Sequence, residues 1–479
     1  MSQANFFPSK SFFVSTLTRD IELKDAILDL LDNCIDGIIR IQEKKKSEDT
    51  EGINKDDPYS DFWAKIEVSE RKFSIHDNCG GISRKIAEES AFRLGRIDNE
   101  VDKGLHTIGM YGIGMKRAIF KMGRHAIVSS VNGSDRYVVE ITPEWLDDDQ
   151  SWGIDIIDKT IERDYDGTHV EVTDLHANIG NKLKSADFVR ELIADISSFF
   201  AIIIKKGFSV YVNNTLVEPA SIDILGPSSL SKKKKSDSSI EPYAFKGSVN
   251  GVNINLVVGF YRTLANTAEV EEVLDADEDH PQRKSNNAGW TVICNDRIIL
   301  YRDKTRVTGW GQRDVPQYHT QFIAISGVVI FDGDDSAKLP LGTTKRTLDT
   351  SSEVYLIALN YMMDGLKQFT SFTNLYKGKE EETNDDFKFM RPMSPSAIIS
   401  YYESSRRMNA VRANIKGTTA TKVALNLPKP KNEERDKRIM FYKPQSEIEQ
   451  VAQHLFGSIE INAGQVGQEC FEMILRESK

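Results

Sequence analysis

The sequence predicts an α+β protein with two sheet-containing regions and a helical C-terminal region. Apolar residues recur at helical spacing near the N-terminus, and runs rich in β-branched and aromatic residues then follow in two groups separated by a polar loop. The final part of the chain alternates helical and polar stretches without an obvious strand. We therefore expect a first domain at 1–220, a second at 221–375, and a linker with a basic, helical region at 376–479.

The composition fits a chain of several folded domains. Its 479 residues correspond to two to four domains of about 150 residues, and 39% are hydrophobic. Lys and Arg number 62 against 72 Asp and Glu, which excludes a uniformly basic nucleic-acid coat but not a local basic patch. No secretion signal and no apolar run near about 20 residues is visible. We expect a cytoplasmic protein with no membrane partner.

The cysteines and histidines do not indicate a metal cluster. The four cysteines at 34, 79, 294 and 470 are far apart in the sequence, and no histidine has zinc-site spacing with a cysteine. This pattern is typical of a reducing compartment.

The first domain begins with a helix between Asp20 and Arg40, because its apolar residues repeat every three or four positions. The polar segment 41–60 is interpreted as a mobile insertion. Short strands are expected at 64–68, 72–76, 126–131, 137–141 and 169–173, with a helix at 188–204 and a hairpin at 213–214.

The second domain begins after a Ser- and Lys-rich loop at 228–239. The stretches 247–261, 289–301 and 321–331 are rich in Val, Ile and aromatic residues and predict a second sheet. A helix is expected at 352–372, followed by a charged linker.

One face of the first helix is crowded with acidic residues. Like charges at this spacing are destabilising unless they are solvated or meet cations, and a magnesium ion would relieve them. A merely solvated acidic face is the alternative, and it is the better interpretation if the helix is taken alone. The residues on this face are Asp25, Asp29, Asp32, Asn33 and Asp36.

A strand that ends in Asp77 is followed by Gly80 and Gly81. A carboxylate followed by bare backbone can accept a hydrogen bond from an exocyclic amine while a flat base lies against the glycines. This chemistry suits adenine, although the same residues taken alone also fit an ordinary turn.

A glycine-rich stretch from Gly109 to Lys116 precedes a helix. Its glycines free the backbone to direct N–H groups at an anion, and Lys116 adds a positive charge, so phosphate binding is the natural use. A further pair, Gly167-Thr168, opens a strand and taken alone indicates only a turn.

In this order the four elements resemble the GHKL ATPases, the family of gyrase B, the large heat-shock chaperones, histidine kinases and MutL. The resemblance covers roughly residues 15–220 and implies a Bergerat-type ATPase sandwich that binds ATP and Mg²⁺. It implies that Asn33 is the magnesium ligand, that Asp77 binds the adenine amine and that Gly81 lets the base approach. It assigns Gly109, Gly112, Gly114 and Lys116 to the phosphate lid, and Thr168 to support of Asp77.

One position departs from the family pattern. Members that hydrolyse ATP carry Glu four residues before the magnesium Asn, as general base for the attacking water, and here that residue is Asp29. The shorter side chain reaches less far, so the expected hydrolysis is slow. Asp32 points to the side of its neighbour Asn33, because successive residues of an α-helix are rotated by ~100°, and it receives no role.

The second domain resembles the S5-like transducer domain of MORC ATPases across 245–370. In such proteins a transducer lysine reaches the γ-phosphate, and Lys345 is the candidate for this role. An ordinary loop lysine is the alternative.

A basic block lies near the C-terminal end. Residues 404–443 hold eleven Lys or Arg against three Asp or Glu. They predict contact with the phosphates of DNA or RNA, or else pairing with the acidic remainder of the chain or with another subunit. Downstream, 448–456 and 466–475 are expected to be amphipathic helices that pack on the body.

Together these inferences predict a magnesium-dependent ATP-binding protein and slow ATPase that opens and closes a homodimer. MORC-like and MutL-like relatives act as clamps on DNA, so the resemblance implies a role on DNA or with an effector partner in defence or DNA processing. A nucleotide-gated scaffold without turnover and a chaperone-like ATPase stay open. A histidine kinase is disfavoured, because no histidine lies in a phospho-acceptor pattern.

Overall fold

The computed structural model describes residues 9–47, 57–93, 112–149, 151–227, 240–266, 268–272, 287–342, 345–411, 419–430 and 439–478. The chain forms two compact units, Met1–Lys429 and Pro430–Lys479, which are treated separately below. None of the helices within the described ranges has the length and apolar character needed to span a lipid bilayer.

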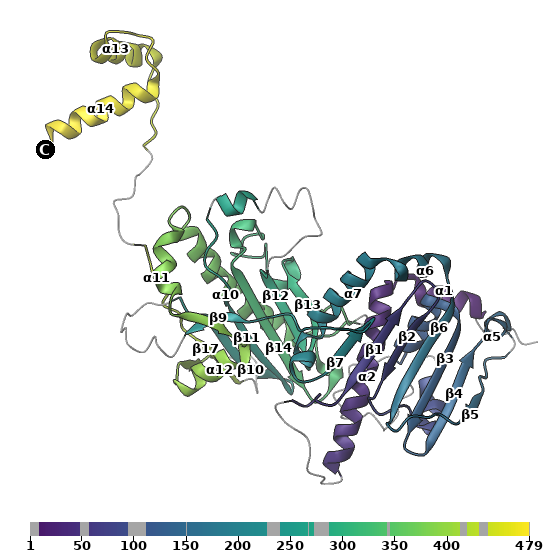
Figure 1. The fold of residues 1–479 in the computed structure, drawn as a ribbon. Coiled ribbons are helices and arrows are strands. Elements are labelled where there is room, and N and C mark those ends of the chain that lie inside the picture. Colours follow the sequence, from purple (N-terminus) through teal and green to yellow (C-terminus); the bar gives the residue numbers. More distant parts are fainter. Residues whose placement is uncertain are drawn as a thin grey trace, which may run out of the picture. The chain divides into compact units, whose positions relative to one another are not determined.

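The larger unit begins with a mixed, mostly antiparallel sheet of eight strands in the order β5-β4-β3-β6-β2-β1-β7-β8 (Figure 1). Only β1 and β7 pair in parallel. The strands are β1 (Trp63–Val68), β2 (Phe73–Asp77), β3 (Gly123–Asn132), β4 (Asp135–Ile141), β5 (Ile156–Asp158), β6 (Gly167–Leu175), β7 (Ser209–Val212) and β8 (Thr215–Leu216).

The apolar stripe of α2 (Leu23–Ser47) packs on this sheet. Its Ile27, Leu31 and Ile35 are fully buried in one core with strand residues such as Phe73 and Val128, as the helical spacing predicts. The other helices of this region are α1 (Lys10–Arg19), α3 (Arg84–Ile86), α4 (Gly114–Met122), α5 (Pro143–Asp147), α6 (Ala177–Lys184), α7 (Ala186–Phe199) and α8 (Ala201–Lys205), with a π-helical turn η1 (Ala87–Ala91).

The insertion expected at 41–60 is smaller than predicted. Residues 41–47 continue α2, and Tyr59 is buried, with its hydroxyl donating to Asp296 Oδ2 at 3.0 Å. Residues 48–56 lie outside the described part of the chain.

A second sheet of seven strands follows in the order β13-β12-β14-β11-β10-β17-β16. The expected strand regions 247–261 and 289–301 are each a hairpin, because Asn250, Asn295 and Asp296 adopt positive φ and reverse the chain. The strands are β10 (Tyr243–Val249), β11 (Val252–Phe260), β12 (Gly289–Cys294), β13 (Arg297–Asp303), β14 (Ile325–Gly333), β16 (Met408–Ala410) and β17 (Thr419–Val423), and β9 (Ile224–Pro227) pairs separately with β15 (Met390–Met393).

Helices cover both faces of the second sheet. Successive strand residues point to opposite faces, so Phe245 packs in a core with α10 (Glu353–Leu375) while Ala244 packs with α12 (Pro395–Ser404). A short helix, α11 (Asn384–Phe387), adds Phe387 to the α10 side.

We expected no strands in the region 376–429, but β16 and β17 extend the second sheet next to β10. These two strands are short and polar, and they lack the apolar alternation by which a strand is recognised in a sequence. The smaller unit contains α13 (Gln445–Phe456) and α14 (Ala463–Glu477), which contact each other, and Ala452 and Val466 are their buried residues.

Candidate functional site

A cavity of about 220 Å³ lies between α2, the end of β2, the start of α4 and the segment that carries Lys345. Nine of the ten residues to which the family resemblances give a role line it, and the tenth, Gly109, lies outside the described residues. The nine are Asp29, Asn33, Asp77, Gly81, Gly112, Gly114, Lys116, Thr168 and Lys345.

Asp77 forms one end of the cavity. Its Oδ1 accepts backbone N–H groups from Cys79 at 2.8 Å and Thr168 at 3.3 Å. Burial raises the pKa of Asp77 to about 6, against the lowering effect of these hydrogen bonds. The carboxylate is therefore ionised at neutral pH, and Thr168 supports it through its backbone rather than its hydroxyl.

Two cysteines far apart in the sequence lie beside Asp77. The Cys34 and Cys79 thiols and an Asp77 oxygen lie within 4.8 Å of one another, and all three residues are buried. The separation of these two cysteines in the sequence gave no sign that they lie close together. The hydrogen bond with Cys79 and burial raise the pKa of Cys34 well above its ordinary value. Both thiols therefore stay protonated and serve as weakly polar lining.

Close backbone contacts set the shape of this end. Gly81 has φ +66°, and a Cβ there would lie 2.1 Å from the Val131 carbonyl oxygen. The close contact with β3 therefore requires glycine at this position, independently of the role in base binding that the resemblance implies. Gly37, which sequence reasoning missed, acts likewise, because a Cβ there would lie 2.2 Å from the Cys79 carbonyl oxygen. It lets α2 touch the loop after β2.

The acidic residues of α2 are mostly buried. Asp29 and Asp36 are 5% and 3% exposed and line the cavity with Asn33, whose side chain is open to it. Asp25 pairs with Arg346 at 2.6 Å. A purely solvated acidic face is therefore the wrong interpretation, because protein cations balance part of the charge.

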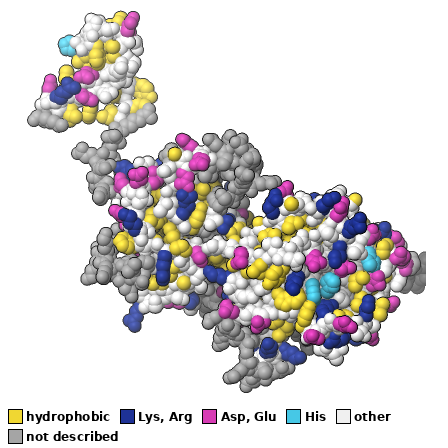
Figure 2. Space-filling model, viewed as in Figure 1, with side chains coloured by type: hydrophobic (Ala, Val, Ile, Leu, Met, Phe, Trp, Pro, Cys, Tyr) yellow, Lys and Arg dark blue, Asp and Glu magenta, His cyan; other side chains and the backbone are white. Residues whose placement is uncertain are grey.

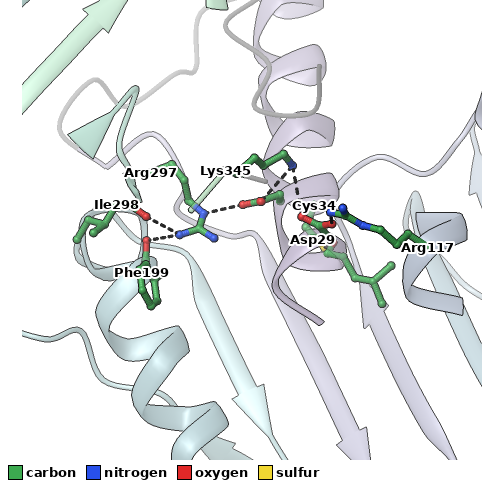
Figure 3. Close-up of polar contacts among 9 residues, drawn as sticks. Asp29, Cys34, Arg117, Phe199, Arg297, Ile298 and Lys345 are labelled. Atoms are coloured by element: carbon green, nitrogen blue, oxygen red, sulfur yellow. Dashed lines mark hydrogen bonds and ion pairs between the residues drawn. The ribbon is translucent and has the colours of Figure 1, made fainter. Parts of the chain in front are cut away.

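At the other end of the cavity, Asp29 lies against the start of α4. A Cβ on Gly114 would lie 3.4 Å from Asp29 Cβ. Asp29 Oδ2 pairs with Arg117 at 2.5 Å, and Oδ1 lies 4.0 Å from Lys345 Nζ (Figure 3). The candidate base is thus held between two cations, of which sequence analysis named only Lys345.

Lys116 and Arg117 have different surroundings. Lys116 Nζ donates to the Ala91 carbonyl oxygen at 2.6 Å, and burial lowers the pKa of Lys116 to about 8. Its ammonium group is therefore held by backbone, whereas Arg117, one residue further on, pairs with Asp29. Adjacent residues of a helix point in directions about 100° apart, and sequence alone did not decide which of them meets the acid.

The start of α4 is suited to bind an anion. Gly112 has φ +63°, and the N-cap residue Ile113 makes no side-chain capping hydrogen bond. The N–H groups of the first turn therefore lack a side-chain cap while Gly112, Ile113 and Gly114 line the cavity.

Asp32, to which the sequence analysis gave no role, is fully buried and connects the two sheet regions. Its Oδ1 accepts from Arg297 Nε at 2.7 Å and its Oδ2 accepts from Lys345 Nζ at 3.1 Å. Burial alone raises the pKa of Asp32, but the two cations outweigh this effect and hold the pKa below its ordinary value. Asp32 therefore stays ionised and anchors Lys345 at the cavity.

The basic block 404–443 is only partly described. Arg407 pairs with Glu241 at 2.5 Å and Lys422 with Asp364 at 3.4 Å, so these cations have partners within the chain. Arg406 is exposed. Figure 2 shows Lys and Arg interspersed with Asp and Glu over the face in view. Arg412 and Lys416 lie outside the described residues.

Comparison with known proteins gives a family match for part of the first sheet region. Residues 21–173 match the model of the family described as histidine kinase-, DNA gyrase B- and HSP90-like ATPases. The matched stretch holds the described cavity residues named above except Lys345, and it ends before the second sheet. No curated protein matches the chain. This part of the chain is therefore similar to GHKL ATPase domains, and the similarity supports ATP binding.

Proposed function

We propose that this protein binds ATP with magnesium in the cavity of the GHKL domain and hydrolyses it slowly. The nucleotide state closes and opens a homodimer clamp. The observation that carries the proposal is the convergence of residues from α2, β2, α4 and β6 on one cavity, which Lys345 enters from beyond the family match.

Asp77 is proposed to select adenine. Its ionised carboxylate accepts the exocyclic amine, while the Cys79 and Thr168 N–H groups hold Oδ1 in place. The buried thiol of Cys34 adds weakly polar surface beside the base. A guanine, whose amine and carbonyl are placed differently, would meet the wrong donor and acceptor pattern here.

The phosphates are proposed to lie at the N-terminus of α4, with Lys345 contacting the terminal one. The uncapped first turn supplies N–H groups, and Lys345 Nζ is already within 4.0 Å of Asp29. Asn33, Asp29 and Asp36 line the cavity and carry the oxygen donors that magnesium prefers, so these residues fit the ion. Bound there, magnesium would neutralise phosphate charge.

Asp29 is proposed as the general base that accepts the proton of the attacking water. Its contacts with Arg117 and Lys345 compete for the oxygens that must take this proton. Slow turnover follows, because one of these contacts must loosen before the carboxylate can bind water productively.

A nucleotide-gated scaffold is the second candidate, and the Arg117–Asp29 pair favours it. A carboxylate held in this pair, on a side chain shorter than the family Glu, could orient the helix start without taking a proton. ATP would then drive dimerisation without being consumed.

The clamp is further proposed to act on DNA or RNA, or with a defence or DNA-processing partner, through the exposed cations of 404–443. Arg406 supports this part of the proposal, whereas Arg407 and Lys422 have carboxylate partners.

Calorimetry of purified protein with ATP, ADP and GTP, with and without magnesium, tests the proposed function, together with phosphate release. We expect ATP to bind only with magnesium and more tightly than GTP, with slow phosphate release. Absence of ATP binding would overturn the proposal, while binding without phosphate release would favour the scaffold.

A further inference from the structure

The β12–β13 hairpin inserts its tip against the ATPase domain. Asn295 and Asp296 form the turn with φ of 45° and 68°. Asp296 accepts from Tyr59 at 3.0 Å and pairs with Lys206 at 2.7 Å. The next residue, Arg297, extends to Asp32 on α2. The hairpin tip thus brings a cation of the second sheet to the helix that lines the nucleotide cavity.

Arg297 is held on several sides. It is 2% exposed, and besides Asp32 it donates to the carbonyl oxygens of Phe199 at 3.0 Å and Ile298 at 2.8 Å (Figure 3). Its guanidinium also lies 4.1 Å from the ring centroid of Phe200. These contacts hold Arg297 beside Asp32, and Arg297 does not itself line the cavity.

Lys345 is held less completely. Its ammonium group contacts two acids, Asp32 at 3.1 Å and Asp29 at 4.0 Å, and the residue lines the cavity. Its backbone φ is +55°. Asp32 therefore has one partner that is anchored in the protein and one that faces the ligand space.

A fully buried carboxylate needs a counter-charge, because an unpaired charge in the interior is strongly unfavourable. If Lys345 were the only partner of Asp32, moving it to a phosphate would leave Asp32 uncompensated. Arg297 removes that penalty, because it keeps its hydrogen bond to Asp32 Oδ1 when Oδ2 is vacated.

We propose that Arg297 is a positioning residue that balances Asp32, so that Lys345 can move from Asp32 to the terminal phosphate of ATP. This inference rests on the proposed function, in which Lys345 contacts that phosphate. In the absence of ATP, Asp32 then holds Lys345 through their ion pair. Since ADP lacks the terminal phosphate, the arrangement affects the preference for ATP over ADP and not nucleotide binding in general.

The test measures the ratio of ATP to ADP affinity in full-length variants by calorimetry with magnesium. Arg297→Met keeps the length but removes the charge, so Asp32 should retain Lys345. The preference for ATP should fall about ten- to a hundredfold, the size expected for one charged hydrogen bond. ADP affinity should be unchanged. Arg297→Lys keeps a charge and should retain most of the preference.

The double variant Asp32→Asn/Arg297→Met removes both charges and should restore the preference for ATP, because Lys345 is then no longer held by a buried carboxylate. Lys206→Met serves as the matched control: it weakens hairpin docking at Asp296 but leaves Asp32 and Arg297 paired, so the ratio should stay at its wild-type value. Circular dichroism checks that each variant is folded.

A folded Arg297→Met variant that keeps the wild-type preference for ATP overturns this inference but not the proposed function. A double variant that does not regain the preference for ATP has the same consequence. An equal loss in Lys206→Met and Arg297→Met would show that docking is responsible, and also overturns this inference. If Arg297→Met does not fold, Asp32→Asn carries the test, and a fall in ATP preference contradicts the proposal. A wild-type chain that binds neither nucleotide overturns the proposed function together with this inference.

Discussion

The two ends of the cavity are held in place differently. At the end that we propose for adenine, Asp77 is fixed by N–H groups of Cys79 and Thr168, within one sheet and its adjoining loop. At the end that we propose for the phosphates, Asp29 and Asp32 are fixed by side-chain ion pairs with α4 and with the second sheet region. The adenine end is therefore held by backbone groups of one sheet region, while the phosphate end depends on ion pairs that a bound anion can compete for.

Replacing Asp29 by Asn should have the largest effect, and it acts at the phosphate end alone. The amide cannot take a proton, so phosphate release should fall by about 10²- to 10⁴-fold while ATP stays bound. Steady-state phosphate release and calorimetry measure the two effects. Asp29→Glu restores the family side chain and should keep turnover. A wild-type rate that survives Asp29→Asn within twofold would assign the protein to the scaffold class.

Replacing Asp77 by Asn should weaken ATP binding by about 10- to 100-fold, because the variant loses a charge-assisted hydrogen bond of about 1.5–3 kcal/mol. GTP binding should change little, which separates base recognition from general damage. Competition with a fluorescent adenine nucleotide measures both affinities. Equal losses for ATP and GTP would contradict base recognition by Asp77 and the view that the adenine end works independently.

Asn33→Ala tests the magnesium site that we propose between the two ends. Loss of an oxygen ligand should raise the magnesium concentration needed for ATP binding by about tenfold or more. Magnesium titrations at fixed ATP give this value, and chelation should release ATP from the wild-type protein. Unchanged magnesium dependence in Asn33→Ala would place the ion elsewhere.

The pH dependence of ATP binding provides a smaller effect at the adenine end. Burial raises the pKa of Asp77 to about 6, and in the proposed pose the ionised carboxylate is the stronger acceptor for the adenine amine. Affinity should therefore be full above this pKa and fall as pH drops through it, by up to about fourfold between pH 7.5 and 5.5. ATP itself titrates in this range, so the loss is taken relative to Asp77→Asn, which lacks the group. Parallel pH profiles for the two proteins would contradict this origin.

The same contrast explains how much the sequence could predict. The residues proposed for the adenine end and the helix start belong to short motifs, and those of them that the structure describes line the cavity. The sequence predicted a mixture of helices and sheets, and the structure shows a mixed α/β fold with an antiparallel-rich sheet. Arg117, Asp32 and Arg297 were missed because their partners are distant: 88 residues separate Arg117 from Asp29, and 265 separate Arg297 from Asp32. Helical periodicity shows which face a residue occupies but not which cation meets it.

Glycine contacts and the strands of the C-terminal part show the same limit. Gly37 permits α2 to touch the Cys79 carbonyl, a requirement that appears only when the two segments are placed together. The strands β16 and β17 are stabilised by the pairing of β17 with β10 and of β16 with β17, and they are too short to show a clear apolar alternation.

The smallest expected effect concerns the basic block. The question is whether a cation that already forms an ion pair within the protein can still bind phosphate. Arg407 pairs with Glu241 and lies 5.2 Å from the Tyr402 ring centroid, whereas exposed Arg406 has no carboxylate partner among the described residues. If nucleic acid binds here, Arg406→Glu should reduce the steepness of the salt dependence by about 0.9 for each phosphate that the variant no longer neutralises. Arg407→Glu places two carboxylates together and should instead lower the melting temperature. Fluorescence anisotropy with duplex DNA at several salt concentrations, and thermal unfolding, separate these effects. A slope unchanged in Arg406→Glu, or no binding at low salt, would leave the block as a structural surface whose charges serve the second sheet.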